Sequence, residues 1–297
     1  MCKKGGIMES LYSKTKFLLD KYKLSANKSL GQNFLINDDV VEKIVDSANV
    51  GKEDLVIEIG PGLGNLTELL LERAGKVIAI ELDERMIKIL NDRFSLYKNF
   101  ELLNQDVLKV DLKKLIDDNK VGDIKCVKIV ANLPYYITTP IIMKLLEDKL
   151  DIDSITVMIQ KEVADRLIAE PGSKLSGAIT YCVYYYAKSE KVVLVDNKSF
   201  IPEPAVDSEV IKLLIRKNYP VDLKDENEFF KLIKVSFMQR RKTLINSFVN
   251  GGIVQNKDEA RALFDELNLD YNTRGETLTI EQFAEISNYL VTKKNNK

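Results

Sequence analysis

Val56-Ile57-Glu58-Ile59-Gly60-Pro61-Gly62-Leu63-Gly64 is the stretch of this 297-residue chain that decides its fold. A run of β-branched residues passes directly into a glycine-rich turn, and a helical pattern follows at 66–73. Glycines in such a turn let the backbone approach a ligand and adopt dihedral angles that side chains forbid. The stretch therefore predicts a buried strand, a tight turn and a helix, with a turn that a ligand can approach closely.

The same alternation of strand and helix extends on both sides of this turn. Strands are predicted at 55–59, 76–80, 100–103, 127–131 and 155–159, with a closing pair at 192–195 and 210–215. Helical spacing occurs at 40–47, 66–73, 84–94, 140–146 and 162–168. Continuous apolar strands that alternate with helices indicate a Rossmann-like α/β fold, with helices on both faces of a mostly parallel sheet.

The pattern changes after about residue 217. Asn218-Tyr219-Pro220 interrupts regular structure there, because proline disfavours its continuation. Helical spacing then recurs at 227–236, 238–249, 257–267 and 279–292, with few strand signals. We therefore predict a larger α/β domain over 1–217, with a basic N-terminal extension to about residue 28, and a smaller all-helical domain over 218–297.

Composition excludes several classes of protein. With 45% hydrophobic and 30% charged residues the chain has the makeup of a folded globular protein. It contains no histidine, which excludes histidine metal sites and Ser-His or Cys-His catalysis. Cys2, Cys126 and Cys182 form no CxxC pair, so no metal site is predicted. No apolar run reaches the roughly 18 residues of a membrane span, and we expect a cytoplasmic protein.

The formal net charge of −1 is unevenly distributed. The N-terminal extension carries a lysine excess: Lys3, Lys4, Lys14, Lys16, Lys21, Lys23 and Lys28 against Glu9 and Asp20. A second basic cluster is Arg240-Arg241-Lys242. Such local patches bind phosphates even in a nearly neutral chain, although lysine-rich faces are often simply solvated.

Two acidic residues follow the next two strands. Glu81 stands 21 positions after Gly60, at the tip of the second strand, where a carboxylate can bind both ribose hydroxyls of an adenosyl group. Asp106 follows the third strand and could accept from an adenine amino group, or could cap a helix. Pro61 removes a backbone N–H where a pyrophosphate would need a donor. This favours S-adenosylmethionine over a nicotinamide dinucleotide.

The fourth strand ends in Asn132-Leu133-Pro134-Tyr135, at the edge of the sheet where ligands bind. The Asn132 amide oxygen and the Leu133 carbonyl can each accept one hydrogen from an adenine N6 amino group and so favour methyl transfer to that nitrogen. Tyr135 offers a ring for base stacking, and Phe200 is the candidate for a second stacking face, although either ring alone could be core packing. This pattern predicts an adenine N6 methyltransferase.

These motifs together resemble one family: the bacterial small-subunit ribosomal RNA dimethyladenosine transferases, the kasugamycin-sensitivity enzymes. The resemblance covers nearly the whole chain. Beyond Glu58–Gly62 and the Asn-Leu-Pro-Tyr segment, it rests on Ser29-Leu30-Gly31-Gln32-Asn33-Phe34-Leu35, Gln160-Lys161-Glu162-Val163-Ala164, Pro171-Gly172-Ser173-Lys174, Phe200-Ile201-Pro202-Glu203-Pro204, Val206-Asp207-Ser208 and Phe237-Met238-Gln239-Arg240-Arg241-Lys242-Thr243-Leu244.

The resemblance implies a seven-stranded methyltransferase core that uses S-adenosylmethionine, with a helical domain that binds rRNA. It implies dimethylation of two adjacent adenines in a hairpin near the 3′ end of 16S rRNA, late in 30S assembly. We expect a monomer, although the sequence leaves the oligomeric state open. The implied cofactor contacts are Asn33, Leu35, Gly60, Gly62, Glu81, Asp106 and Asn132. Gly64 lies where the motif varies and carries less weight, and Arg240, Arg241 and Lys242 would contact rRNA phosphates.

Four other functions compete with this one. Large-subunit rRNA adenine methyltransferases of the macrolide-resistance type are similar through the core, but the Gly31-Gln32-Asn33 and Val206-Asp207-Ser208 motifs favour the small-subunit enzymes. A DNA adenine methyltransferase would have proline in place of Leu133. A non-catalytic assembly factor on the same fold would not need the N6 acceptor pair. An NAD-dependent oxidoreductase would need hydride-transfer residues, which are not recognisable here.

Overall fold

The computed structural model describes residues 10–27, 31–239 and 241–295. Several residues singled out from the sequence lie outside these ranges: Cys2, Lys3, Lys4, Glu9, Lys28, Ser29, Leu30 and Arg240. The chain divides into two compact units, one made of 1–164 with 190–215 and the other of 165–189 with 216–297. Both units therefore draw on two separate segments of the sequence.

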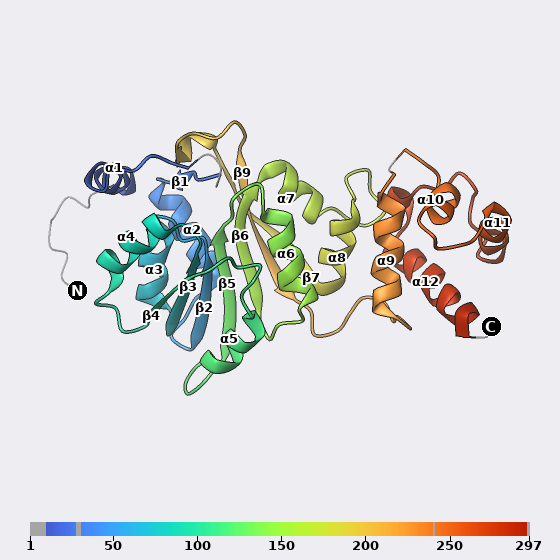
Figure 1. Ribbon diagram of the computed structural model, residues 1–297, viewed down its shortest axis with the longest axis horizontal. Helices are drawn as coiled ribbons and strands as arrows, with labels where there is room; N and C mark the ends of the chain where they lie inside the picture. Colours follow the sequence, from blue (N-terminus) through green and yellow to red (C-terminus); the bar gives the residue numbers. More distant parts are fainter. Residues whose placement is uncertain (1–9, 28–30, 240, 296–297) are drawn as a thin grey trace. The chain divides into compact units, whose positions relative to one another are not determined.

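A seven-stranded sheet organises the first unit, with the strand order β4-β3-β2-β5-β6-β9-β7 (Figure 1). The strands are β2 (Asp54–Ile59), β3 (Lys76–Glu81), β4 (Phe100–Asn104), β5 (Cys126–Asn132), β6 (Ser154–Gln160), β7 (Ala187–Val195) and β9 (Ser208–Ile215). The five strands from β4 to β6 are parallel, and β9 runs antiparallel to β6. The carboxyl ends of β2, β3 and β5 therefore share one edge of the sheet.

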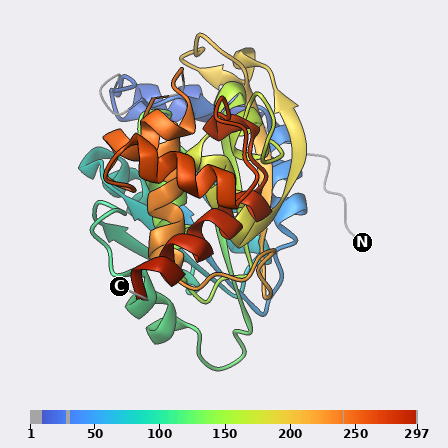
Figure 2. The ribbon, with the colours of Figure 1, turned by 90° about the vertical axis from the view of Figure 1, so that its right-hand side faces the viewer.

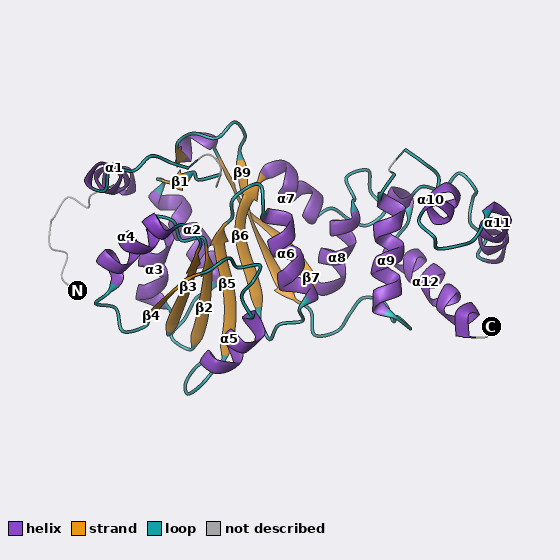
Figure 3. Cartoon of the chain, in the orientation of Figure 1, coloured by secondary structure: helices purple, strands orange, loops and turns teal. Residues whose placement is uncertain are grey.

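Helices cover both faces of this sheet (Figure 3). They are α2 (Asp38–Ala48), α3 (Asn65–Arg73), α4 (Glu84–Phe94), α5 (Leu112–Asn119), α6 (Thr138–Glu147) and α7 (Lys161–Leu167). Buried side chains of α2, α3 and α4 form one core with Val56, Val77 and Val130 of the sheet. Connections between parallel strands of one sheet are almost always right-handed, so those from β4 to β5 and from β5 to β6 place α5 and α6 on the other face. The predicted Rossmann-like architecture is confirmed.

Two short segments far apart in the sequence form a second, two-stranded sheet. β1 (Phe34–Leu35) pairs antiparallel with β8 (Phe200–Ile201), so that Leu35 lies opposite Phe200. The Ile36 N–H also donates to the Ser199 carbonyl at 2.8 Å. This pairing joins the N-terminal motif to the segment that carries Phe200.

The second unit is helical (Figure 2), and aromatic side chains pack at its centre. Its helices are α8 (Ala178–Tyr186), α9 (Glu226–Phe237), α10 (Leu244–Asn250), α11 (Lys257–Glu266) and α12 (Ile280–Asn295). The ring centroids of Tyr181 and Phe283 lie 4.9 Å apart, and those of Tyr185 and Tyr219 lie 4.4 Å apart. α8 packs on α9 through its tyrosines, so residues 165–189 belong to the same compact unit as residues 216–297. The sequence had suggested two consecutive domains that meet at residue 217.

The helices differ from expectation at four places, one of which is α5 (Leu112–Asn119), a helix that the sequence did not predict. α10 begins at Leu244 rather than 238, because Thr243 is in an extended conformation and the Lys242 N–H donates to the Gln239 carbonyl in a turn. α1 (Leu11–Lys21) was not predicted within the basic extension, and neither was α8. The sequence Ala-Ile-Thr-Tyr-Cys-Val-Tyr-Tyr-Tyr of α8 is apolar on nearly all sides, so it shows no amphipathic period. Within the described ranges, every helix is too short or too polar to span a bilayer.

Candidate active site

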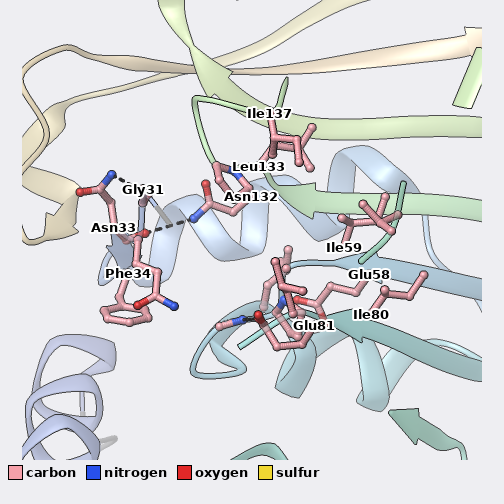
Figure 4. Close-up of a pocket in the computed structure, with 18 of the residues that line it drawn as sticks. Gly31, Asn33, Phe34, Glu58, Ile59, Ile80, Glu81, Asn132, Leu133 and Ile137 are labelled. Atoms are coloured by element: carbon pink, nitrogen blue, oxygen red, sulfur yellow. Dashed lines mark hydrogen bonds between the residues drawn. The ribbon is translucent and has the colours of Figure 1, made fainter. Parts of the chain in front are cut away.

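One cavity opens at the carboxyl ends of β2, β3 and β5 (Figure 4). The space inside it, open solvent at the mouth included, is about 1150 Å³. All ten residues predicted to act in the site line it: Asn33, Leu35, Gly60, Gly62, Glu81, Asp106, Asn132, Leu133, Tyr135 and Phe200. Among the described residues no cluster of His, Cys, Asp and Glu could hold a metal ion.

The glycines of the turn after β2 serve different purposes. Gly60 and Gly62 have φ angles of 68° and 57°, and a Cβ on Gly60 would meet no atom closer than 3.9 Å. Their lack of side chains keeps the cavity floor open. A Cβ on Gly64 would instead lie 2.4 Å from the ring of Phe94. Gly64 therefore lets α3 and α4 pack closely and does not form the floor.

Glu81 holds the turn in place from the tip of β3. Its Oε2 accepts from the Gly62 N–H at 3.2 Å and its Oε1 from the Asp83 N–H at 2.8 Å. The side chain is 7% exposed, and this burial raises the pKa of Glu81 while the backbone hydrogen bonds lower it. A carboxylate has about four acceptor positions, so Glu81 keeps acceptor capacity for ligand hydroxyls.

Asn132 and Leu133 present two acceptors to the cavity. The Asn132 Nδ2 donates to the Asn33 carbonyl at 3.4 Å, the contact drawn as a dashed line in Figure 4. The Leu133 N–H donates to the Met158 carbonyl at 3.1 Å. Within the described parts of the chain, no hydrogen bond occupies the Asn132 Oδ1 or the Leu133 carbonyl. Both oxygens can accept hydrogens from a ligand.

The two aromatic candidates differ in exposure. Tyr135 is half-buried, its hydroxyl lies 2.9 Å from the Ser208 Oγ, and burial raises its pKa. Phe200 is 3% exposed and belongs to the core as well as to the cavity wall. Asp106 also lines the cavity, and its Oδ1 accepts from the Leu108 N–H at 3.0 Å.

Three polar residues of the site were not assigned a role from the sequence. Gln32 donates to the Asp83 Oδ2 at 2.9 Å and so ties the N-terminal motif to the tip of β3. The Ser208 Oγ lies 2.9 Å from the Tyr135 hydroxyl. Glu58 is fully buried beneath the turn, where the Thr67 hydroxyl donates to it at 2.6 Å. The sequence did contain a signal for Glu58, because an acidic residue within an apolar, buried strand is unusual.

Burial raises the pKa of Glu58 to about 8, although the Thr67 hydrogen bond opposes the shift. The folded protein therefore keeps a proton at neutral pH that the unfolded chain releases above about pH 4.5. The contribution of Glu58 to stability is largest at low pH and falls as pH rises towards 8. For one proton, the fall is at most about 1.4 kcal/mol per pH unit.

We expect Glu58→Gln to remove this dependence. Between pH 5 and 8 the free energy of unfolding of the parent should fall relative to that of the variant. Above pH 8 the difference between the two free energies should stay constant. Urea unfolding at pH 5 to 9 measures both curves. Parallel curves over that range would show that Glu58 is ionised in the folded protein.

The chain also matches a known protein family in sequence. Residues 23–291 match the family model described as "Ribosomal RNA adenine dimethylase". The chain belongs to the ribosomal RNA adenine dimethylase family. The resemblance seen in the motifs is thereby confirmed, and this rRNA adenine dimethylase is an S-adenosylmethionine-dependent methyltransferase.

Relatives match over almost their full length. The "Ribosomal RNA small subunit methyltransferase A" of Clostridioides difficile (strain 630) is 48% identical over 288 residues, which cover 97% of this chain and 99% of the relative. The protein of the same name from Geobacillus sp. (strain WCH70) is 49% identical over 280 residues, 93% of this chain and 96% of the relative.

Solved structures agree with the fold. A dimethyladenosine transferase from Plasmodium falciparum superposes with a TM-score of 0.70 at 29% identity, covering 89% of this dimethylase and 98% of that chain. The 23S rRNA methyltransferase ErmE superposes with a TM-score of 0.64 at 24% identity, covering 87% and 100%. The second likeness, at this identity, concerns the fold alone.

Proposed function

We propose that this dimethylase modifies N6 of two adjacent adenines in the hairpin near the 3′ end of 16S rRNA, as a cytoplasmic monomer acting late in 30S assembly. The names of the relatives that are 46–49% identical support the small subunit over the large. The observation that carries the chemistry is the pair of free acceptors, Asn132 Oδ1 and the Leu133 carbonyl, on the wall of the cavity in the described part of the chain.

The cavity fits S-adenosylmethionine. Glu81 would bind the ribose hydroxyls with its remaining acceptor positions, and Asp106 would accept from the adenine amino group. Gly60 and Gly62 leave room for the cofactor over the turn, while Asn33, Leu35 and Asn132 border the same space. When bound, the cofactor supplies an electrophilic methyl group on sulfur.

The protein prepares the nitrogen of the substrate base. The lone pair of adenine N6 is delocalised into the ring, which makes the amino group a poor nucleophile. Asn132 Oδ1 and the Leu133 carbonyl each accept one N6 hydrogen, which fixes the nitrogen and stabilises the positive charge that develops on it. The methylated ammonium is acidic and loses its proton afterwards, so the absence of histidine from the sequence is no obstacle.

Stacking holds the flipped base in the slot. Extruding a base from its stack costs a few kcal/mol, and stacking of that base on one aromatic ring offsets roughly 1–3 kcal/mol of the cost. Tyr135 provides the half-buried ring, and Phe200, which pairs with Leu35, forms part of the cavity wall. The Tyr135 hydroxyl lies 2.9 Å from the Ser208 Oγ, and this contact orients the ring.

A double-mutant cycle tests the role of Ser208. Tyr135→Phe and Ser208→Ala remove the same hydrogen bond, so each should slow methyl transfer by about 2- to 10-fold. The double variant should be no slower than the slower single variant, because only one interaction is removed. Single-turnover rates with saturating RNA measure all four proteins. Multiplying effects would show that the two hydroxyls act independently.

The second unit supplies further RNA contacts in this proposal. Arg241 and Lys242 are exposed on the turn before α10, where they can reach rRNA phosphates. We propose that they act together with the rest of the helical region 218–297 as RNA contacts of the second unit.

Tritiated-methyl transfer to 30S subunits from a strain without the enzyme tests the whole proposal. We expect label on two adjacent adenines near the 3′ end of 16S rRNA. Label on 23S rRNA or on duplex DNA would favour the macrolide-resistance or DNA-modifying alternatives. Binding without any label would favour the non-catalytic assembly factor.

A further inference from the structure

α1 is docked on the first unit, beside the wall of the cavity. Its inner face carries the buried residues Leu11, Thr15 and Leu18. The Asn65 Nδ2 donates to the Thr15 Oγ1 at 2.9 Å and to the Leu35 carbonyl at 2.8 Å. Because Asn65 and Leu35 both line the cavity, α1 lies directly behind the cavity wall.

The outer face of α1 is basic and aromatic. We define it by Tyr12, Lys16, Phe17 and Lys21, all exposed to solvent. Phe17 is 61% and Tyr12 42% exposed, which is high for large apolar side chains. The Lys16 Nζ lies 4.6 Å from the centroid of the Tyr12 ring.

The charges of this face are available to a partner. Neither Lys16 nor Lys21 forms an ion pair with any described residue, whereas the neighbouring Lys14 lies 3.5 Å from Glu68. Asp20 is the one acid among residues 11–21. A positive solvent-exposed face on the helix that packs behind the cavity wall, in a chain with a net charge of −1, complements a polyanion.

We infer that the outer face of α1 binds the RNA that delivers a base to the cavity. Lys16 and Lys21 contact phosphates, and Tyr12 and Phe17 pack against sugars or unpaired bases. RNA accounts for the lysines and the rings together, whereas a protein partner would leave unexplained why the basic face belongs to the helix that packs behind the cavity wall. This inference rests on the proposed function and extends it to a second contact surface.

The salt dependence of binding isolates the phosphate contacts. Removing one phosphate contact lowers the slope of log K against log salt by roughly 0.7–0.9. We expect Lys16→Gln/Lys21→Gln in the full chain to bind 30S subunits several-fold more weakly, with a slope reduced by roughly 1.5. The rate at saturating 30S and the affinity for S-adenosylmethionine should not change. Phe17→Ala should weaken binding roughly 5-fold or more at every salt concentration, with an unchanged slope.

Lys113→Gln/Lys114→Gln is the matched control, since both lysines are exposed on α5, at the bottom of Figure 1 and away from α1. Its slope should equal that of the parent. An unchanged slope in the α1 double variant, or an equal reduction in the α5 control, would overturn this role of α1. Failure of the unmodified chain to methylate 30S subunits would instead refute the proposed function. Only the measurement on the unmodified chain tests that function, so the two failures can be told apart.

Discussion

Asn132→Ala is expected to slow methyl transfer about 10²–10³-fold, equivalent to roughly 3–4 kcal/mol of transition-state stabilisation. The change removes the Oδ1 acceptor that fixes the adenine N6, and it also removes the hydrogen bond from Nδ2 to the Asn33 carbonyl. The buried strand β5 is otherwise unaltered, so the fold should survive. Single-turnover transfer to 30S subunits with both substrates saturating measures the effect.

A matched variant separates catalysis from stability. Asn99→Ala removes an amide that donates to the Leu71 and Ala74 carbonyls, at the amino end of β4 and away from the cavity. We expect it to lower the free energy of unfolding but to leave the rate per folded molecule unchanged. If Asn132→Ala and the parent transferred methyl groups at comparable rates, the acceptor pair would have no role in the mechanism.

Glu81→Ala is expected to raise the Kd for S-adenosylmethionine about 10- to 100-fold, because hydrogen bonds to a charged group contribute about 1.5–3 kcal/mol. The substitution removes the proposed acceptor for the ribose hydroxyls. It also frees the Gly62 N–H, which Glu81 now holds at 3.2 Å. Titration calorimetry with the cofactor alone, without RNA, measures this effect directly.

Glu101→Ala provides the comparison for Glu81. Glu101 is a carboxylate on β4 that pairs with Lys76 at 2.7 Å, outside the residues that line the cavity. Its removal should leave the Kd for the cofactor unchanged. If Glu81→Ala also bound the cofactor with the affinity of the parent, the ribose would have to be bound elsewhere.

Local sequence patterns were sufficient for the core of the fold. The five strands from β2 to β6 begin and end within one residue of their predicted limits, and α4 matches its predicted range. Buried parallel strands are continuous apolar runs bounded by turns, so the residues next to each strand are enough to predict where it begins and ends. The glycine turn and the acids Glu81 and Asp106 were predicted as site residues from their positions directly after these strands. Asn33 and Leu35 were predicted from the family resemblance.

Tertiary structure decided what depends on residues far apart in the chain. α8 is helical although its sequence is apolar on nearly all sides, because its tyrosines pack among aromatic rings from α9 and α12. Pairing of Leu35 with Phe200, and the hydrogen bond between Tyr135 and Ser208, join motifs that periodicity treats as separate. The proton on Glu58 likewise follows from complete burial. Periodicity reports only the neighbours of a residue along the chain, while contacts, burial and pKa depend on its neighbours in space.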